Sequence, residues 1–453
     1  MLSQRINGVT RRELARVVLT TVLLLPIAPG TVAAQHEGHA MPGTPKPDGM
    51  QLMMSGPLGI PMSRGGSGTS WLPDAAPMYG AMRSAGRWGV MAHGVVFGEV
   101  SAQGGSRGDT QIGSINWGML GVTHALAGGR VQLRGMASLD PFTVGGKGYP
   151  LLLQTGESYR GEALHDRQHP HDLFMEVAAL YDRALTKNAA VQLYLAPVGE
   201  PAVGPPAFPH RSSGMTDPFA PISHHWQDAT HISFGVVTAA LYTGRMKLET
   251  SLFNAREPDD VRTNFDLNGA RLESRAVRFT LNPGAGASLS MSGARLVDAE
   301  RAHPGETVRR ATASLLLNET SATTIGWSFA AIVGGNAVGH DRWSKSMTLE
   351  GARPIGARVV LFSRLEAVQK SAAELVLRAV GADGTHSDDQ LFAVTAVSLG
   401  ATRELHAWAG GSVGVGARGT VNVIPNALRA IYGSRTPLGA TIFVRWRPSR
   451  MVM

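Results

Sequence analysis

The residues best suited to chemistry in this sequence are histidines, and many of them fall in one part of the chain. His165, His169 and His171 lie in the segment HDRQHPHD, which ends on Asp172. Imidazole nitrogens and carboxylate oxygens at such close spacing can bind a divalent transition metal. We therefore predict that this segment contributes ligands to a metal site.

A second group of histidines lies further along the chain and also includes an acidic residue. It consists of His210, His224, His225, Asp228 and His231. Together the two groups hold seven of the 15 histidines of the chain, so these residues are concentrated rather than scattered. The alternative is a hydrogen-bonded polar network that binds no metal. The predicted metal ligands in the two groups are His165, His169, His171, Asp172, His224, His225 and His231.

A third candidate site is a stretch rich in methionine and histidine that begins at residue 35. It starts with the sequence QHEGHAM, which contains His36 and His39, and five further methionines follow it. Thioether sulfur suits Cu(I), and imidazole suits copper in either oxidation state. We therefore predict His36 and His39 as further metal ligands, with a plain exported tail as the alternative. The five methionines are Met50, Met53, Met54, Met62 and Met78.

The sequence offers little for hydrolytic catalysis. Ser212 or Ser223 beside His224 would be the simplest serine–histidine arrangement, and Asp166 with His169 or His171 would be an acid–base pair. Neither Ser212 nor Ser223 lies in a GxSxG motif, no HExxH motif is present, and the chain has no cysteine to act as a nucleophile. We expect no enzymatic activity and no required cofactor, and an outer-membrane hydrolase is the less favoured alternative.

Composition excludes several classes of protein. The chain has 453 residues, of which 43% are hydrophobic and only 17% are charged, and its formal net charge is +8. It is too apolar to be disordered, and without cysteine it is neither a disulfide scaffold nor a cysteine-ligated zinc protein. Its basic residues are scattered rather than clustered, so we expect no binding of nucleic acid.

The first 34 residues have the pattern of a secretory signal peptide. Four arginines precede a short apolar stretch at 17–27, and small residues occupy 32–34. The stretch is too short for a membrane-spanning helix. Twin arginines at Arg11 and Arg12 leave the twin-arginine export route open, and an uncleaved anchor is a further alternative. We predict export, followed by a lead-in or plug-like segment at 35–84.

From residue 86 onward, apolar and polar residues alternate in about sixteen runs. The run 246–257 begins MKLETSLF, in which Met246, Leu248 and Leu252 alternate with polar residues. Strict alternation predicts strands whose two faces meet different surroundings. The predicted strands are 87–100, 111–126, 129–143, 172–186, 189–200, 231–243, 246–257, 271–282, 286–298, 308–319, 322–335, 342–354, 357–370, 389–402, 405–419 and 438–448.

The connections between these runs alternate between short and long. Short turns, such as those predicted at 127–129 and 402–404, join even runs to odd runs, and the clearest long connections are 144–171 and 201–230. Short turns at one end and long loops at the other are typical of outer-membrane barrels. Charged residues in the runs should then face the lumen. The residues predicted to face inward are Glu176, Asp182, Lys247, Glu249, Arg295, Arg364 and Glu366.

Residues 86–453 resemble the bacterial outer-membrane β-barrels of porin-like size. The resemblance rests on the strand number, on the turn alternation and on the export signal that precedes them. The resemblance implies an all-β fold: a closed antiparallel transmembrane β-barrel of about 16 strands at 85–453, with fourteen or eighteen as alternatives. It also implies short periplasmic turns and long outer loops. One departure is the final RPSRMVM, because such barrels usually end in an aromatic residue. By the same resemblance we expect the outer membrane of a Gram-negative-type bacterium, contact with lipid and with the barrel-assembly machinery, and possible homo-oligomers.

The segment that begins at residue 35 resembles the methionine- and histidine-rich lead segments of outer-membrane copper-resistance proteins, although it lacks their repeated Met-x-x-Met blocks. We predict a passive channel or binding protein for small solutes or metal ions, copper or another divalent metal among them. The two histidine groups would lie side by side at the outer mouth and narrow the pore. The alternative is a copper-sequestering resistance protein with a blocked lumen.

Overall fold

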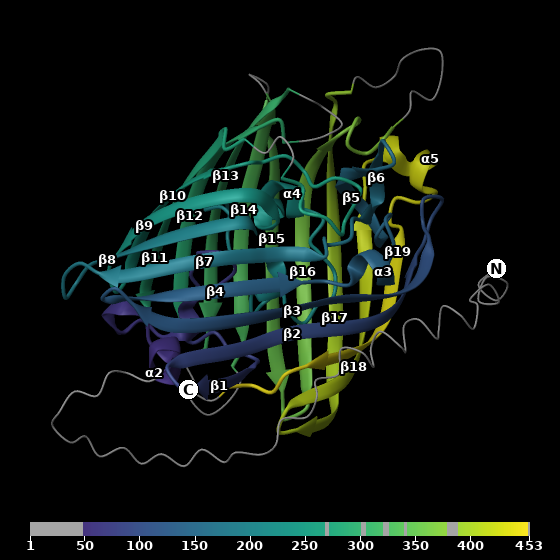
Figure 1. Cartoon of the computed structure of the whole chain (residues 1–453). Helices are drawn as coiled ribbons and strands as arrows, with labels where there is room; N and C mark the ends of the chain where they lie inside the picture. Colours follow the sequence, from purple (N-terminus) through teal and green to yellow (C-terminus); the bar gives the residue numbers. More distant parts are fainter. Residues whose placement is uncertain are drawn as a thin grey trace.

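The computed structural model describes residues 49–267, 271–299, 305–319, 326–338, 342–377 and 388–451. Sixteen antiparallel strands close into a barrel (Figure 1), which confirms the predicted fold class. Each strand pairs with the next along the chain, and β19 closes the barrel against β2, with Val444 opposite Gly98. The predicted signal peptide at 1–34, together with His36 and His39, lies outside the described residues.

The barrel strands occupy nearly the ranges that the alternation predicts. They are β2 (Trp88–Gln103), β3 (Thr110–Leu126), β4 (Gly129–Ala137), β7 (Phe174–Ala184), β8 (Ala190–Gly199), β9 (Ser233–Tyr242), β10 (Met246–Phe253), β11 (Ser274–Gly284), β12 (Ala287–Val297), β13 (Thr307–Asn318), β14 (Ser328–Val338), β15 (Ser344–Ile355), β16 (Val359–Ser371), β17 (Leu391–Trp408), β18 (Gly411–Val423) and β19 (Leu438–Arg447).

Three further strands and several short helices complete the described chain. β1 (Ala81–Ala85) forms a hairpin with the start of β2, and β5 (Tyr149–Tyr159) pairs with β6 (Glu162–Gln168). None of the described helices is long and apolar enough to cross a membrane. The helices are α2 (Gly49–Met54), η2 (Pro57–Gly59), η3 (Met62–Arg64), α3 (Asp140–Thr143), η4 (Phe208–His210), α4 (His224–Gln227), η5 (Ala229–His231), η6 (Asn426–Leu428) and α5 (Arg429–Tyr432).

The turn between β17 and β18 is not where the sequence predicts it. The prediction at 402–404 is wrong, because β17 continues to Trp408 and β18 begins only at Gly411. Arg403 and Glu404 still pair with β18, and a register shift follows between Glu404 and His406. The polar residues that resemble a turn are therefore part of a long hairpin, whose strands extend further than their neighbours.

Side chains alternate between the lumen and the outer face of the barrel. Along β10, Lys247 and Glu249 are buried while Leu248 is 53% exposed. The inward prediction holds for six of the seven residues named, which are all buried, but it is wrong for Arg295, which is exposed; the six are Glu176, Asp182, Lys247, Glu249, Arg364 and Glu366. Arg295 lies near the end of β12, where a long side chain can reach polar surroundings from the outer face.

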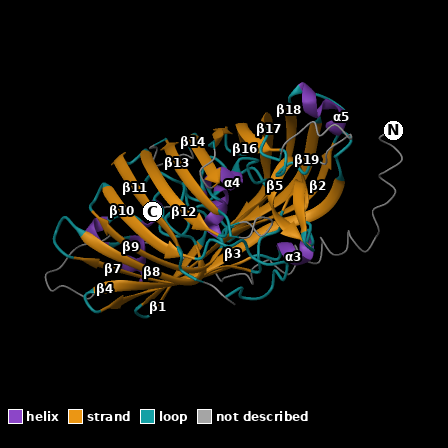
Figure 2. Cartoon of the chain, turned by 90° about the horizontal axis from the view of Figure 1, so that it is seen from above, coloured by secondary structure: helices purple, strands orange, loops and turns teal. Residues whose placement is uncertain are grey.

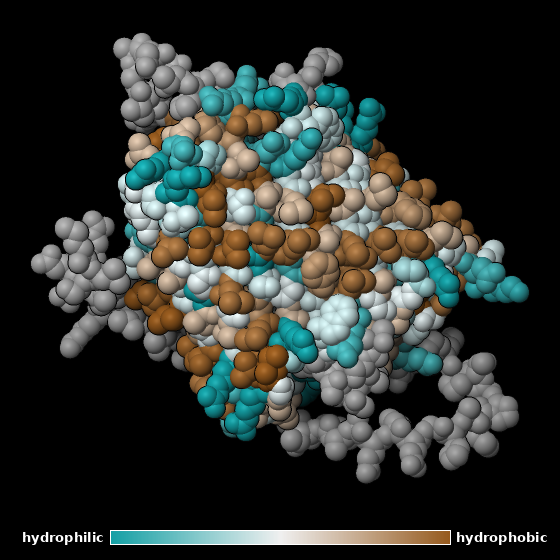
Figure 3. Space-filling view, turned by 180° about the vertical axis from the view of Figure 1, so that it is seen from behind, coloured by the Kyte–Doolittle hydropathy of each residue, from teal (hydrophilic) through white to brown (hydrophobic). Residues whose placement is uncertain are grey.

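Large apolar side chains cover the outer face of the strands. Figure 3 shows a band of them across the strands on one side of the barrel. In a soluble protein such a surface would be unusual, since large apolar patches mark binding or membrane-facing surfaces. Examples from successive strands are Leu120, Leu133, Leu193, Leu241, Leu248, Val277, Met291, Val333, Leu361, Leu399 and Ile442.

The segment 51–80, here called the plug segment, lies in the lumen near the turn end of the barrel. Thr69 and its neighbours are buried against inward-facing side chains. The Lys247 ammonium donates to the Thr69 carbonyl oxygen at 2.5 Å, and Arg134 donates to the Gly68 carbonyl oxygen at 2.6 Å. Asn282 holds the Leu72 carbonyl oxygen at 2.8 Å. Side chains of the wall therefore bind the backbone of the plug segment directly.

Two long connections also fold into the lumen, where they fill much of its width. They are the β4–β7 loop (138–173), which contains β5 and β6, and the β8–β9 loop (200–232), which contains α4. Figure 2 shows α4 inside the ring of strands, where it contacts β13, β14 and β15. Most residues of the β8–β9 loop are buried. The two loops thus bring the histidine groups side by side, and because they turn inward most of these histidines are buried.

Candidate metal centre

The β8–β9 loop is held across the lumen by polar contacts with the barrel wall. Arg211 forms an ion pair with Glu350 of β15 at 2.7 Å, and its other side reaches Asp228 of the same loop at 2.6 Å. The Trp226 indole donates to Ser344 at 2.8 Å. These contacts fix the short helix α4, which carries two of the predicted metal ligands.

The β4–β7 loop brings a third predicted ligand to α4. His169 follows β6, and its ring centroid lies 6.1 Å from that of His224 and 5.6 Å from that of His225. Gly156 of β5 packs against the His225 ring at a φ of +113°, and a Cβ at this position would overlap that ring. Glycine is therefore needed here, both for its backbone conformation and for the space it leaves.

His169, His224 and His225 form a group that we call the three-histidine centre. One nitrogen from each ring can be chosen so that all three lie within 4.8 Å of one another. In each ring, Nε2 is buried and has no hydrogen-bond partner. Metal–nitrogen bonds are about 2.0–2.1 Å long, so an ion bound to all three rings needs their nitrogens within about 4.2 Å of one another. Small rotations of the rings would bring the nitrogens that close.

Carboxylates hold the other side of two of these rings. His224 Nδ1 lies 2.6 Å from Asp228 Oδ1, whereas His169 Nδ1 is hydrogen-bonded to the Pro170 carbonyl oxygen at 3.1 Å and lies 3.2 Å from Glu157 Oε1. A carboxylate that accepts from Nδ1 fixes the tautomer and leaves the Nε2 lone pair free for a metal ion. Arginines anchor both carboxylates, because Arg211 pairs with Asp228 and Arg262 pairs with Glu157 at 2.5 Å.

Burial keeps His169 and His225 neutral near pH 7. It lowers the pKa of His169 to about 4 and that of His225 well below its usual range. Burial raises the pKa of the Asp228 carboxyl, but the Arg211 guanidinium and His224 more than offset this, so its pKa is lowered overall. His169 and His225 are therefore neutral imidazoles, which can bind a metal, and the Asp228 carboxylate behind the centre stays ionised.

Two further predicted ligands lie beside the centre in a second layer. The ring of His231 is 5.0 Å from that of His224 and 5.6 Å from that of His171. His171 Nδ1 lies 2.8 Å from Asp140 of α3, and His231 Nδ1 lies 2.9 Å from the carbonyl oxygen of Asp228. The imidazoles of both loops thus form one continuous cluster.

The other predicted ligands are not brought into the three-histidine centre. His165 is partly exposed, and its Nδ1 lies 2.9 Å from Asp166. Asp172 lies 3.6 Å from the Arg262 guanidinium. Sequence reasoning missed Gly156, Glu157 and Asp140, which position the histidines. No spacing signal points to them, since Gly156 contacts His225 of the other loop, and Glu157 and Asp140 lie far from their histidine partners along the same loop.

The serine residues considered for hydrolysis have partners elsewhere. The Ser223 hydroxyl donates to Glu366 at 3.0 Å and shares a hydrogen bond with Thr348 at 2.6 Å. The Ser212 hydroxyl lies 3.0 Å from the Asn318 side-chain nitrogen. His224 directs its Nδ1 to Asp228 instead of orienting its ring towards either hydroxyl. Ligand binding is therefore better supported by this geometry than acyl transfer.

Comparison with known proteins finds likenesses among solved structures alone. No family model and no curated protein sequence matches the chain. OmpF of Salmonella typhi in complex with daunomycin has 11% identity, a TM-score of 0.48, and coverage of 79% of this chain and 97% of its own. The anion-selective porin of Comamonas acidovorans has 11% identity, a TM-score of 0.46, and coverage of 80% and 99%.

The outer-membrane channel DcaP of Acinetobacter baumannii is similar over 82% of this chain and 100% of its own, with 9% identity and a TM-score of 0.44. The sequences of all three proteins are thus distant from this one. The strand pairing described above defines the barrel without them.

Proposed function

We propose that this chain is an outer-membrane barrel whose filled lumen binds a transition-metal ion, copper(II) or another divalent metal that favours imidazole. The observation that carries the proposal is the convergence of three buried imidazoles whose Nε2 atoms have no partner. A buried nitrogen without a partner costs free energy, and a bound metal ion would remove that cost.

The surface and the strand closure support the membrane location. In hydrocarbon every backbone N–H and C=O must be paired within the protein, which a closed barrel achieves. The exposed leucines and valines of the strands suit lipid contact, and the buried charges suit a polar interior. This arrangement would be unfavourable in water, where the outer face would promote aggregation.

The packing of the lumen favours binding over free passage of large solutes. The β8–β9 loop crosses from Ser251 of β10, which accepts from the Ala202 amide at 2.8 Å, to Glu366 of β16. The plug segment occupies the turn end. Slow passage of ions is the second candidate function, and the continuous cluster of imidazoles favours it, since weak binding at several sites allows an ion to move on.

The direct test is metal titration of the full chain folded in detergent, with copper(II) and zinc(II) as separate probes. We expect one tight equivalent that is lost in the H169A/H224A/H225A variant. The matched control is H124A/H406A, since both histidines lie on barrel strands outside the centre, where His124 is half-buried and His406 is exposed. Different migration of boiled and unboiled samples on a gel reports whether each variant retains a closed barrel.

Two results would contradict the metal proposal: no tight equivalent in the native chain, or an unchanged equivalent in the triple variant. Conductance in planar bilayers separates the two candidate functions. A binding protein should show little conductance with or without metal. An ion channel should show a small conductance whose ion selectivity changes in the triple variant.

A further inference from the structure

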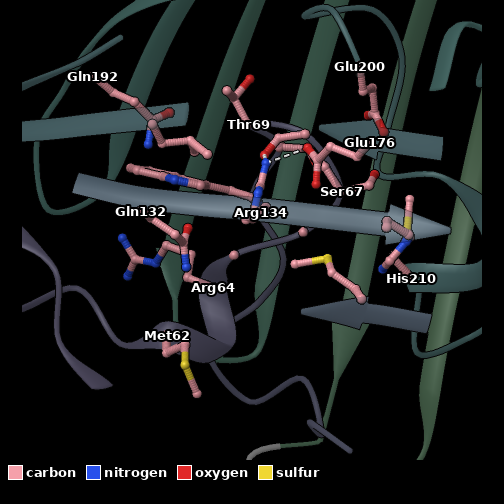
Figure 4. A pocket seen from close by; sticks show the side chains of 18 of the residues that line it. Met62, Arg64, Ser67, Thr69, Gln132, Arg134, Glu176, Gln192, Glu200 and His210 are labelled. Carbon is pink, nitrogen blue, oxygen red and sulfur yellow. Dashed lines mark hydrogen bonds and ion pairs between the residues drawn. The ribbon is translucent and has the colours of Figure 1, made fainter. Parts of the chain in front are cut away.

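Besides the three-histidine centre, the lumen contains a cavity between the plug segment and the β8–β9 loop. Figure 4 shows part of its lining. Its volume is about 130 Å³. Seven of the 18 methionines of the chain line it, together with polar side chains. The lining does not include the ligands of the three-histidine centre, so this methionine cavity is a separate feature.

Three of these methionines lie on neighbouring strands of the barrel wall. Met119 of β3 lies opposite His93 of β2 on one side and opposite Met136 of β4 on the other. Met91 precedes His93 by two residues, so the two side chains lie on the same face of β2. Directly opposite residues have Cβ atoms about 4.5–5.5 Å apart. The register thus places three thioethers and one imidazole in a single patch.

The plug segment covers this patch from inside the lumen. It contributes Met53, Met62 and Met78 to the cavity lining, and Met53 is only 1% exposed. Met175 of β7, also 1% exposed, completes the set. Thioethers therefore reach the cavity from both the wall and the plug, which allows them to surround a small ion.

Two imidazoles border the same cavity. His93 and His210 have ring centroids 6.0 Å apart, and the Trp117 ring lies against both, at 5.1 Å and 4.6 Å. His93 Nε2 is buried and has no hydrogen-bond partner. Methionine often serves only to fill irregular gaps in a core, but gap filling does not explain a buried imidazole nitrogen that is left unsatisfied beside the sulfurs.

The cationic residues of the lining are all in ion pairs, and its remaining acid, Glu200, is hydrogen-bonded to Ser67. Arg134 lies 2.7 Å from Glu176, which is labelled beside it in Figure 4, and Arg130 lies 3.3 Å from Asp182. These pairs leave thioether sulfur and imidazole nitrogen as the uncommitted donors. Calcium and magnesium favour oxygen ligands, whereas soft sulfur ligands select Cu(I).

We propose that the methionine cavity is a second metal site, which binds Cu(I) through the sulfurs of Met91, Met119 and Met136 with His93 as a nitrogen ligand. It is distinct from the three-histidine centre, whose nitrogen ligands suit a divalent ion. His231 contributes to the cavity lining and also lies 5.0 Å from His224 by ring centroids, so the two sites are neighbours in the lumen.

The test is anaerobic titration of the full folded chain with Cu(I) in competition with a Cu(I) chelator, and with Ag(I) as a redox-inert probe. The variant is M91L/M119L/M136L, because leucine keeps the volume of methionine but removes the sulfur. We expect the variant to bind one Cu(I) or Ag(I) equivalent fewer than the native chain and to lose copper–sulfur scattering in X-ray absorption.

The matched control is M246L/M291L/M347L, whose methionines are 46%, 65% and 37% exposed on the outer face. This control should bind as the native chain does. Unchanged stoichiometry and copper–sulfur scattering in the inward variant, confirmed as folded by its gel migration, would overturn the proposal and leave gap filling as the role of these methionines.

The two metal sites can fail independently. H169A/H224A/H225A should retain the Cu(I) equivalent while it loses the divalent one. A native chain that binds divalent metal but no Cu(I) would refute the methionine site alone. A chain that binds Cu(I) but no divalent metal would refute the three-histidine centre alone.

Discussion

Two acid–imidazole pairs determine what the three-histidine centre can do. Glu157 and Asp228 each bind the Nδ1 side of a ligand histidine and are themselves bound by arginine. The carboxylates therefore orient the rings without pointing at the metal position. Such outer partners influence metal affinity nearly as strongly as the ligands themselves.

The first prediction concerns Asp228. We expect D228N to weaken divalent metal binding by about 10–100-fold, because an amide holds the His224 ring less firmly than a carboxylate does. Arg211 keeps its ion pair with Glu350, so the barrel should still fold. Metal titration and gel migration measure the two effects. The control is D109N, whose carboxylate is 58% exposed, and equal affinities in the two variants would refute the positioning role.

A second residue-scale prediction concerns Gly156. We expect G156A to reduce metal affinity, because its Cβ would overlap the His225 ring and because alanine is strained at a φ of +113°. The matched control is G161A in the same hairpin. It also has a positive φ, but its Cβ would meet open space. If both variants lose affinity equally in metal titration, backbone strain and not the His225 contact is responsible.

At the scale of elements, side chains of the barrel wall hold the plug segment by hydrogen bonds to its backbone carbonyl oxygens. These bonds do not depend on the side chains of the plug segment. Lys247 illustrates this, since its ammonium donates to the Thr69 carbonyl oxygen, donates to Gln192 at 2.8 Å and pairs with Glu249 at 3.2 Å. A buried lysine is unfavourable without such partners. Lys247 thus links β10 of the barrel wall to the plug segment, which fills the turn end of the lumen.

We predict that K247M loosens the plug segment while Arg278 continues to pair with Glu249 at 2.7 Å. Amide hydrogens of residues 64–72 should exchange faster, as expected when a local structure opens more often. Hydrogen-exchange mass spectrometry of the folded chain measures this. K187M, in the exposed β7–β8 turn, is the control, and unchanged exchange in K247M would show that the other contacts suffice to hold the plug.

Among elements, strands were predicted more accurately than turns and loops. The order and number of the sixteen barrel strands follow from alternation, because the two faces of every strand meet different surroundings. The turn near Thr402 was misplaced because polar turn-like residues also occur inside a long strand. How far the long loops enter the barrel could not be predicted, since composition does not distinguish a polar loop in water from one in a polar lumen.

At the scale of the whole molecule, the barrel has two surfaces that must remain chemically different. Leu399 is 66% exposed and lies in the middle of the long strand β17, while its neighbour Ser398 is 1% exposed. A change of a single residue can therefore test which surface meets lipid.

We predict that L399R lowers the free energy of unfolding in lipid vesicles by about 2–4 kcal/mol, the cost of an arginine on the lipid face near mid-depth. Urea titration measures the loss. The control is L185R, since Leu185 is 57% exposed in a turn beyond the strand ends. An equal effect in both variants would contradict lipid contact at Leu399.

The sequence by itself determined the barrel, because period-two alternation and short turns are local properties that can be read along the chain. It also identified the histidines, but not which of them meet. Only the tertiary structure decided that His169 joins His224 and His225, that Glu157 and Gly156 support them, and that methionines of three strands share one face. The physical reason is that these contacts depend on strand register and on loops folding into the lumen, which bring together residues far apart in the chain.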